Sequence, residues 1–218
     1  MRILTQANAR TLWYVRAEDI NPNGLDLMPL YAGLQAHYKF RVYPVKLEEL
    51  NPPIGGIVFG RGSFHLDDGQ VVEIVRLEMF SDGLMLDTRH STAVSDKILG
   101  DIITFASKTY RLTFEPSMVQ KKAYVSEVVA TTNVNLGSLS PKLQQFATLL
   151  ADVCGEQLVF QPDQIRFGTD SARPPVSRFR FERQDGIHFS ENRYCSIAPT
   201  TTEKHQQLLD ALECMLSD

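Results

Sequence analysis

The chain has 218 residues, of which 43% are hydrophobic, and this is enough to bury a core without disulfides or metals. Its 22 Lys and Arg residues against 26 Asp and Glu residues give a net charge of −4, which excludes a chain-wide positive field that would attract nucleic acid or an anionic membrane. Three widely spaced cysteines favour free thiols in a reducing compartment, and no apolar run of about 18 residues occurs. We expect a cytoplasmic protein with no membrane segment and no cofactor.

The first fifty residues predict a strand over 11–17, a helix over 27–38 and an extended segment over 39–45. In the helix Leu30 and Leu34 recur at helical spacing, and Asp26 precedes them as a candidate N-cap. The aromatic residues concentrated in this segment suit a core, and they would also suit docking onto another protein. The sequence NPPIGG that follows predicts a turn or hinge.

Three β-type runs follow, over residues 56–66, 70–80 and 84–88. The sequences DDG and SDG separate them, and Asp-Gly pairs are typical of tight hairpin turns, where Gly69 and Gly83 would supply a positive φ. These runs therefore predict an antiparallel meander.

A helix is predicted over residues 93–108, where an apolar stripe includes Ile98 and Ile102. Either Ser91 or Thr92 is its candidate N-cap. The remainder repeats this order. A strand-rich segment over 122–136 precedes a helix over 141–154, and further β-type runs lead to a final helix with Leu208, Leu212 and Met215 on one face.

The predicted fold is α+β, with a mainly antiparallel sheet in meanders and amphipathic helices packed on one side. The repeated order of elements raises the hypothesis of two related halves. No low-complexity linker interrupts the chain, so we expect one unit over 1–218, with sub-blocks at 1–56, 57–155 and 156–218.

One cluster could carry catalysis. His65, Asp67, Asp87 and His90 could supply two imidazoles and two carboxylates to a divalent metal, the ligand set of a metal-dependent hydrolase, because both groups fall at the same end of the meander. Turn and capping roles already account for most of the neighbouring polar residues, and the sequence favours this structural interpretation over the metal site. No P-loop, dinucleotide-binding, zinc-peptidase or nucleophile-elbow motif is present.

Arginines are concentrated in the C-terminal part, where residues 166–193 contain six arginines and no lysine. An extended SRFRFER segment would project Arg178 and Arg180 from one face and its phenylalanines from the other. Guanidinium groups suit carboxylates and phosphates, although nearby acidic residues could instead pair with them. The candidate binding residues are Arg173, Arg178, Arg180 and Arg183.

These observations favour a non-catalytic cytoplasmic subunit or adaptor that acts through a protein partner or as a homo-oligomer. The alternatives are a nucleic-acid backbone binder that uses the arginine strand, and the metal-dependent hydrolase.

Overall fold

The computed structural model describes every residue except 51, 53–54, 155–158, 171–174 and 218. The strands are β1 (Arg2–Tyr14), β2 (Ile57–His65), β3 (Val71–Phe80), β4 (Gly83–Thr88), β5 (Lys121–Thr131), β6 (Gln164–Phe167), β7 (Phe179–Arg183) and β8 (Arg193–Ala198). The α-helices are α1 (Ala17–Ile20), α2 (Met28–His37), α3 (Leu47–Leu50), α4 (Thr92–Tyr110), α5 (Pro141–Cys154) and α6 (Thr202–Ser217). Short 3-10 turns are η1 (Pro116–Met118), η2 (Leu136–Leu139) and η3 (Phe189–Glu191).

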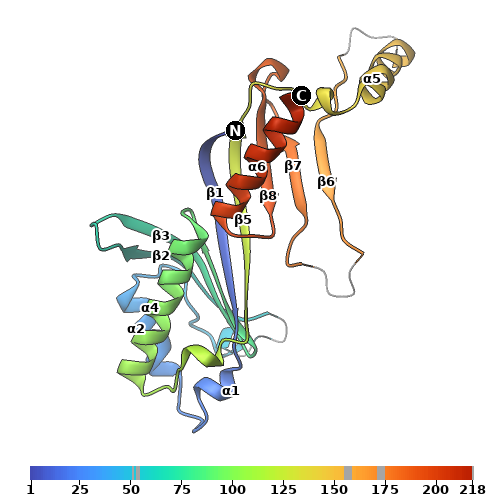
Figure 1. Ribbon diagram of the computed structural model, residues 1–218. Helices are drawn as coiled ribbons and strands as arrows, with labels where there is room; N and C mark the ends of the chain where they lie inside the picture. The colour runs from blue at the N-terminus through green and yellow to red at the C-terminus, as the bar shows by residue number, and fades with distance from the viewer. Residues whose placement is uncertain (51, 53–54, 155–158, 171–174, 218) are drawn as a thin grey trace. The chain divides into compact units, whose positions relative to one another are not determined.

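The strands form an antiparallel sheet in the order β2-β3-β4-β1-β5-β8-β7-β6, and helices pack against it (Figure 1). The predicted α+β fold is therefore confirmed. Within the described residues, no helix is long and apolar enough to cross a membrane.

The chain divides into two compact units whose boundaries fall within β1 and β5. The N-terminal unit comprises residues 7–126, and the C-terminal unit comprises residues 1–6 and 127–218. In the N-terminal unit, β1 is followed by the helices α1, α2 and α3, then by three strands and α4, whereas in the C-terminal unit β5 is followed by α5, then by three strands and α6. The strand orders β2-β3-β4-β1 and β6-β7-β8-β5 correspond. Whether the chain folds as one unit with the three predicted sub-blocks stays a prediction.

Two helices, α2 and α4, cover the sheet in the N-terminal unit. Leu30 and Leu34 of α2 and Ile98 and Ile102 of α4 are buried in one cluster with residues of the strands. Of the two candidate caps, the structure selects Ser91, whose Oγ atom accepts the amide hydrogen of Val94, whereas Thr92 is the first residue of α4. Periodicity and capping chemistry together thus predicted α4 correctly.

One helix, α6, covers the core of the C-terminal unit. Its buried residues are His205, Leu209 and Leu216, whereas Leu208 and Met215 are 49% and 68% exposed. Leu212, the third residue of the predicted apolar face, packs against the core, so that face is correctly predicted as buried at Leu212 but is exposed at Leu208 and Met215. The reason is that α6 has apolar residues on two adjacent stripes, and the buried one includes a histidine.

Two local predictions also need correction. The first strand begins at Arg2 rather than near residue 11, because backbone pairing, not an apolar pattern, defines its polar first half. Gly83 does not have a positive φ; a Cβ atom there would lie 2.7 Å from the carbonyl oxygen of Trp13, so close approach of β1 requires this glycine. Gly69 does have the expected positive φ of 85°.

The aromatic residues proposed for docking contribute largely to the core of the N-terminal unit. Trp13, Tyr38 and Phe40 are buried, and Tyr43 is 42% exposed. The turn predicted at 51–56 lies partly outside the described residues.

Candidate interaction surfaces

Asp87, one of the four predicted metal ligands, lies on β4 in an ion pair. Its side chain is buried, and Arg10 on β1 donates from Nε and Nη2 to the two carboxylate oxygens at 2.7 and 2.8 Å. A bidentate guanidinium contact neutralises a buried carboxylate with favourable geometry. The carboxylate is therefore occupied within the sheet.

The other three predicted ligands have separate local contacts. Asp67, in the turn after β2, pairs with Lys97 on α4, and Nδ1 of His90 accepts the amide hydrogen of Ser91 at 2.9 Å. His65 is exposed at the end of β2. Among the residues that the structure describes, no group of three or more His, Cys, Asp or Glu side chains could hold a metal ion. The four residues are therefore not assembled as ligands.

Ser196 on β8 and His205 on α6 form a hydrogen-bonded pair in the core of the C-terminal unit. Both side chains are fully buried, with 2.8 Å between Ser196 Oγ and His205 Nε2. Ser196 Oγ donates to the carbonyl oxygen of Arg180 at 3.2 Å, so it accepts from His205 Nε2. A catalytic base would instead accept the serine proton at a site that substrate can reach. The pair is therefore structural, and burial lowers the pKa of His205 to about 4.

The cysteines do not form a nucleophilic site either. Cys154 and Cys214 are exposed free thiols near the ends of helices. Burial, with the nearby carboxylates of Glu182 and Glu127, raises the pKa of Cys195. A raised pKa disfavours the thiolate, which is the reactive form.

Arg178 and Arg180, two of the predicted binding residues, line a hollow of about 520 Å³ at the β6–β7 hairpin. We call it the arginine hollow. Arg166 on β6 joins them, because it lies directly opposite Arg180 in the antiparallel pairing. The rest of the lining is Thr169, Pro175, Val176, Ser177 and Ile197. The fourth candidate, Arg173, lies outside the described residues.

The arginine hollow concentrates positive charge. Arg180 has one carboxylate partner, Glu182, with 3.2 Å between Nη2 and Oε1, and both side chains are partly exposed. In the described part of the chain, Arg166 and Arg178 make no ion pair. Like charges directly opposite each other destabilise a strand pair. An anionic ligand would relieve this repulsion, since each guanidinium can donate two N–H groups to a carboxylate or phosphate.

Arg183, also predicted to bind, is a core residue. Strand alternation places it with Phe181 on the buried face of β7, and it is 8% exposed. Its Nη1 donates to the carbonyl oxygen of Phe189 and its Nη2 to the hydroxyl of Tyr194, both at 3.0 Å, and its guanidinium lies over both rings. It therefore does not join the arginine hollow.

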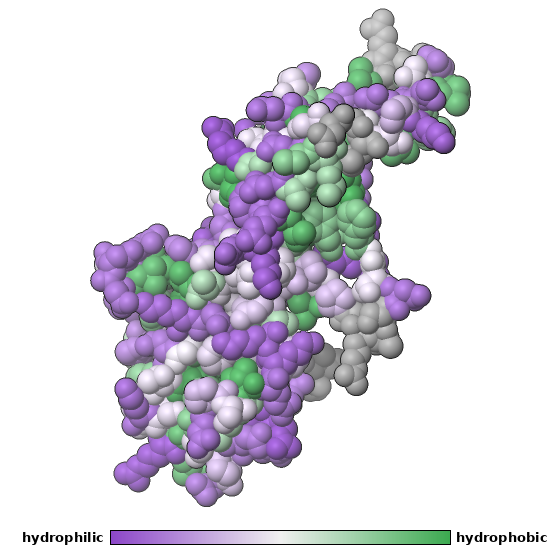
Figure 2. Space-filling model, in the orientation of Figure 1, coloured by the Kyte–Doolittle hydropathy of each residue, from purple (hydrophilic) through white to green (hydrophobic). Residues whose placement is uncertain are grey.

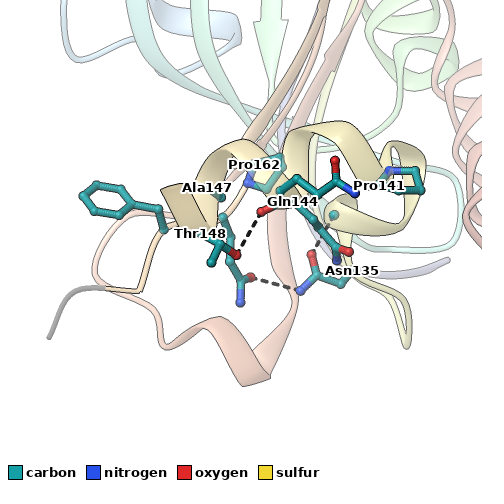
Figure 3. A pocket seen from close by; sticks show the side chains of 10 residues that line it. Asn135, Pro141, Gln144, Ala147, Thr148 and Pro162 are labelled. Atoms are coloured by element: carbon teal, nitrogen blue, oxygen red, sulfur yellow. Dashed lines mark hydrogen bonds between the residues drawn. The ribbon is translucent and has the colours of Figure 1, made fainter. Parts of the chain in front are cut away.

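A second hollow of the C-terminal unit, of about 480 Å³, lies along the polar side of α5 (Figure 3). Gln144 and Thr148 line it from α5, and Asn135 Nδ2 donates to Gln161 Oε1 at 3.0 Å on its other side. The part of the lining that the structure describes has amide and hydroxyl groups but no charged side chain. The hollow shows that the polar side of α5 faces its own chain.

A third hollow, of about 410 Å³, lies in the N-terminal unit, and its residues were not among the predicted site residues. Lys39, Arg41 and Arg61 line it together with Glu73. Lys39 and Arg61 both have φ of 54°, a left-handed conformation that is uncommon outside glycine. The feature of the sequence that could have indicated this basic hollow is Arg61, which lies between Gly60 and Gly62.

No protein-family model matches this chain, and no curated protein matches it. The chemistry of the surfaces described above is therefore what indicates a function for this chain.

Proposed function

We propose that this chain is a non-catalytic cytoplasmic subunit or adaptor that holds an acidic segment of a partner protein in the arginine hollow. The observation that carries the proposal is the placement of Arg166 directly opposite Arg180, with Arg178 in the same hollow. Among the residues that the structure describes, three guanidinium groups against one internal carboxylate leave an excess of positive charge that an acidic partner would neutralise.

The position of β6 supports an extended ligand. β6 ends the strand order, so one of its edges has no neighbouring strand among the described residues. An unpaired edge offers backbone N–H and C=O groups to an added strand. A peptide bound in this way would gain main-chain hydrogen bonds from the edge, while its carboxylates would reach Arg166 and Arg180.

A nucleic-acid backbone is the second candidate ligand, because phosphates suit the same guanidinium groups. The formal charge of −4 favours the protein partner, since the chain as a whole would repel a polyanion that extends beyond the arginine hollow.

The test reverses the charge of two arginines, in Arg178→Glu/Arg180→Glu. The matched control is Lys46→Glu/Lys108→Glu, which makes the same change in net charge at two exposed positions of the N-terminal unit. Circular dichroism should show that both variants fold, because exposed charges contribute only about 0–1 kcal/mol each. Binding is then measured with a fluorescent glutamate-rich peptide and with DNA and RNA oligonucleotides at two salt concentrations.

We expect the arginine variant to lose peptide binding and the lysine variant to retain it. The nucleic-acid function would be favoured if the native protein bound oligonucleotides more tightly than the peptide. The salt slope of oligonucleotide binding should then fall by about one for each phosphate that the arginine variant no longer binds. Equal binding by both variants would mean that the arginines form a solvated face, and would refute the proposal.

A further inference from the structure

The helix α5 exposes an apolar stripe. Leu143, Phe146, Leu149 and Val153 are 52%, 61%, 57% and 76% exposed, and no residue of α5 is buried. Their spacing places them on one side of the helix, opposite the polar side that lines the hollow of Figure 3. We call these four residues the α5 stripe. A helix of 14 residues with an uncovered apolar face is marginal in water, so a covering surface is expected.

The N-terminal unit shows how a helix in the corresponding position is covered. α2 follows β1 as α5 follows β5, and α2 packs beside α4 over the β2 side of the sheet. Leu30 and Leu34 are buried there, and the ring of Tyr31 lies 6.1 Å from that of Phe59 on β2. The corresponding place in the C-terminal unit lies beside α6, over β7 and β6.

That place is open and apolar. Figure 2 shows hydrophobic surface over the strands next to α6. We call it the α6 trough; its exposed residues are Phe167, Leu208 and Met215, and its half-buried residues are Ile165, Phe179 and Leu212.

The orientation of α6 agrees with placing the α6 trough on the side of this helix that faces β7 and β6. Its opposite flank is occupied, because Gln206 donates to the carbonyl oxygen of Met1 and Glu213 accepts from Thr132. Leu208 and Met215 therefore project from the flank that faces β7 and β6.

We infer that the α5 stripe docks in the α6 trough of a second copy of this chain, so that two copies exchange α5 helices about a two-fold axis. Each surface exposes about 400 Å² of apolar area. This estimate combines the exposed fractions of its side chains with the area of about 150–250 Å² that a large aromatic side chain buries. If all of this area became buried, two helices and two troughs would together remove about 1,600 Å² from solvent, the size of a standard stable interface.

A second copy is the occupant that the composition of both surfaces supports. α5 has only Lys142 and Asp152 as charged residues, so it carries no net charge that would select a basic or acidic partner. The chain holds both complementary surfaces, and a two-fold arrangement fills both at once. This inference does not depend on the arginine hollow, because Arg166 and Arg180 lie on the other face of β6 and β7.

The test measures the dissociation constant of the dimer by sedimentation over a range of concentrations. The variants are Phe146→Asp, on the α5 stripe, and Met215→Asp, in the α6 trough. The matched control is Gln145→Asp, at an exposed residue of α5 that lines the polar hollow and does not belong to the α5 stripe. We expect the wild type and Gln145→Asp to form dimers. Each of the other two variants should raise the dissociation constant more than about 100-fold, since each places an unpaired charge in both symmetric contacts.

Mixing the two disrupted variants tests the exchange itself. The intact helix of Met215→Asp fits the intact trough of Phe146→Asp, so the mixture should form a heterodimer more tightly than either variant self-associates. Self-association of Met215→Asp at the wild-type level would instead mean that the helices contact each other, and would overturn the proposal.

A wild-type chain that stays monomeric at every concentration would also overturn it. If Phe146→Asp then lowered the melting temperature while Gln145→Asp did not, α5 would be docked in the trough of its own chain. If neither variant changed the melting temperature, both surfaces would be open in the monomer.

Discussion

The buried His205 makes the C-terminal unit sensitive to acid. Burial lowers its pKa to about 4 from the ordinary value of 6.5. Nε2 donates to Ser196, and Nδ1 is buried with no hydrogen-bond partner in the described part of the chain, so a proton added to Nδ1 would have no acceptor. Because the pKa is lower in the folded chain than in the unfolded chain, the unfolded chain binds the additional proton between these two values. The free energy of unfolding therefore falls as the pH drops through this window, by about 3 kcal/mol in total.

The measurement is urea unfolding, followed by circular dichroism, of the wild type and of His205→Gln at about pH 7.5 and about pH 4. Glutamine retains an amide donor for Ser196 but does not titrate. Acidification affects the carboxylates of both proteins alike, so the wild type should lose about 3 kcal/mol more than the variant. Equal losses would refute the reasoning, because His205 would then have the same pKa in the folded and unfolded chains.

Three further substitutions test the N-terminal unit by thermal or urea unfolding. Ile102→Ala should lower the free energy of unfolding by about 2–5 kcal/mol, since the side chain is 2% exposed, and a change near zero would mean that α4 does not pack there. Gly62→Ala should cost about 1–3 kcal/mol, because its Cβ would lie 2.5 Å from the ring of Phe40; an unchanged melting temperature would contradict this close packing. Asp87→Ala should cost about 1–3 kcal/mol because it removes the ion pair with Arg10, and should leave peptide binding intact; abolished binding with unchanged stability would restore the cluster as a site.

Local chemistry predicted the N-terminal meander and α4 well. The stripe that includes Ile98 and Ile102, the Ser91 cap and the turn at Gly69 all depend on residues close in sequence. The helix α4 has a single apolar face, so periodicity also indicated which of its sides is buried.

The C-terminal unit was harder to predict because its decisive features depend on pairing between distant residues. Arg178 and Arg180 could be recognised as a candidate pair on one strand, but Arg166 joins them only through the register of β6 and β7. The position of Arg183 in the core depends likewise on Tyr194, a residue of the next strand. Sequence alone therefore indicated the type of surface but not its full set of residues.

The short hairpin of β6 and β7 presents two chemically opposite faces, because successive side chains of a strand alternate. Arg166 and Arg180 lie on one face, and Phe167 and Phe179 lie on the other, with 5.8 Å between the two phenylalanine ring centroids. The two proposed contacts should therefore be separable. Reversing the charges of Arg178 and Arg180 should abolish binding of the acidic peptide but leave the dimer dissociation constant within about twofold of the wild type, whereas Met215→Asp should do the opposite. If one substitution removed both properties while circular dichroism showed intact folding, the hairpin would present one coupled surface, and the acidic ligand would bind only to the assembled dimer.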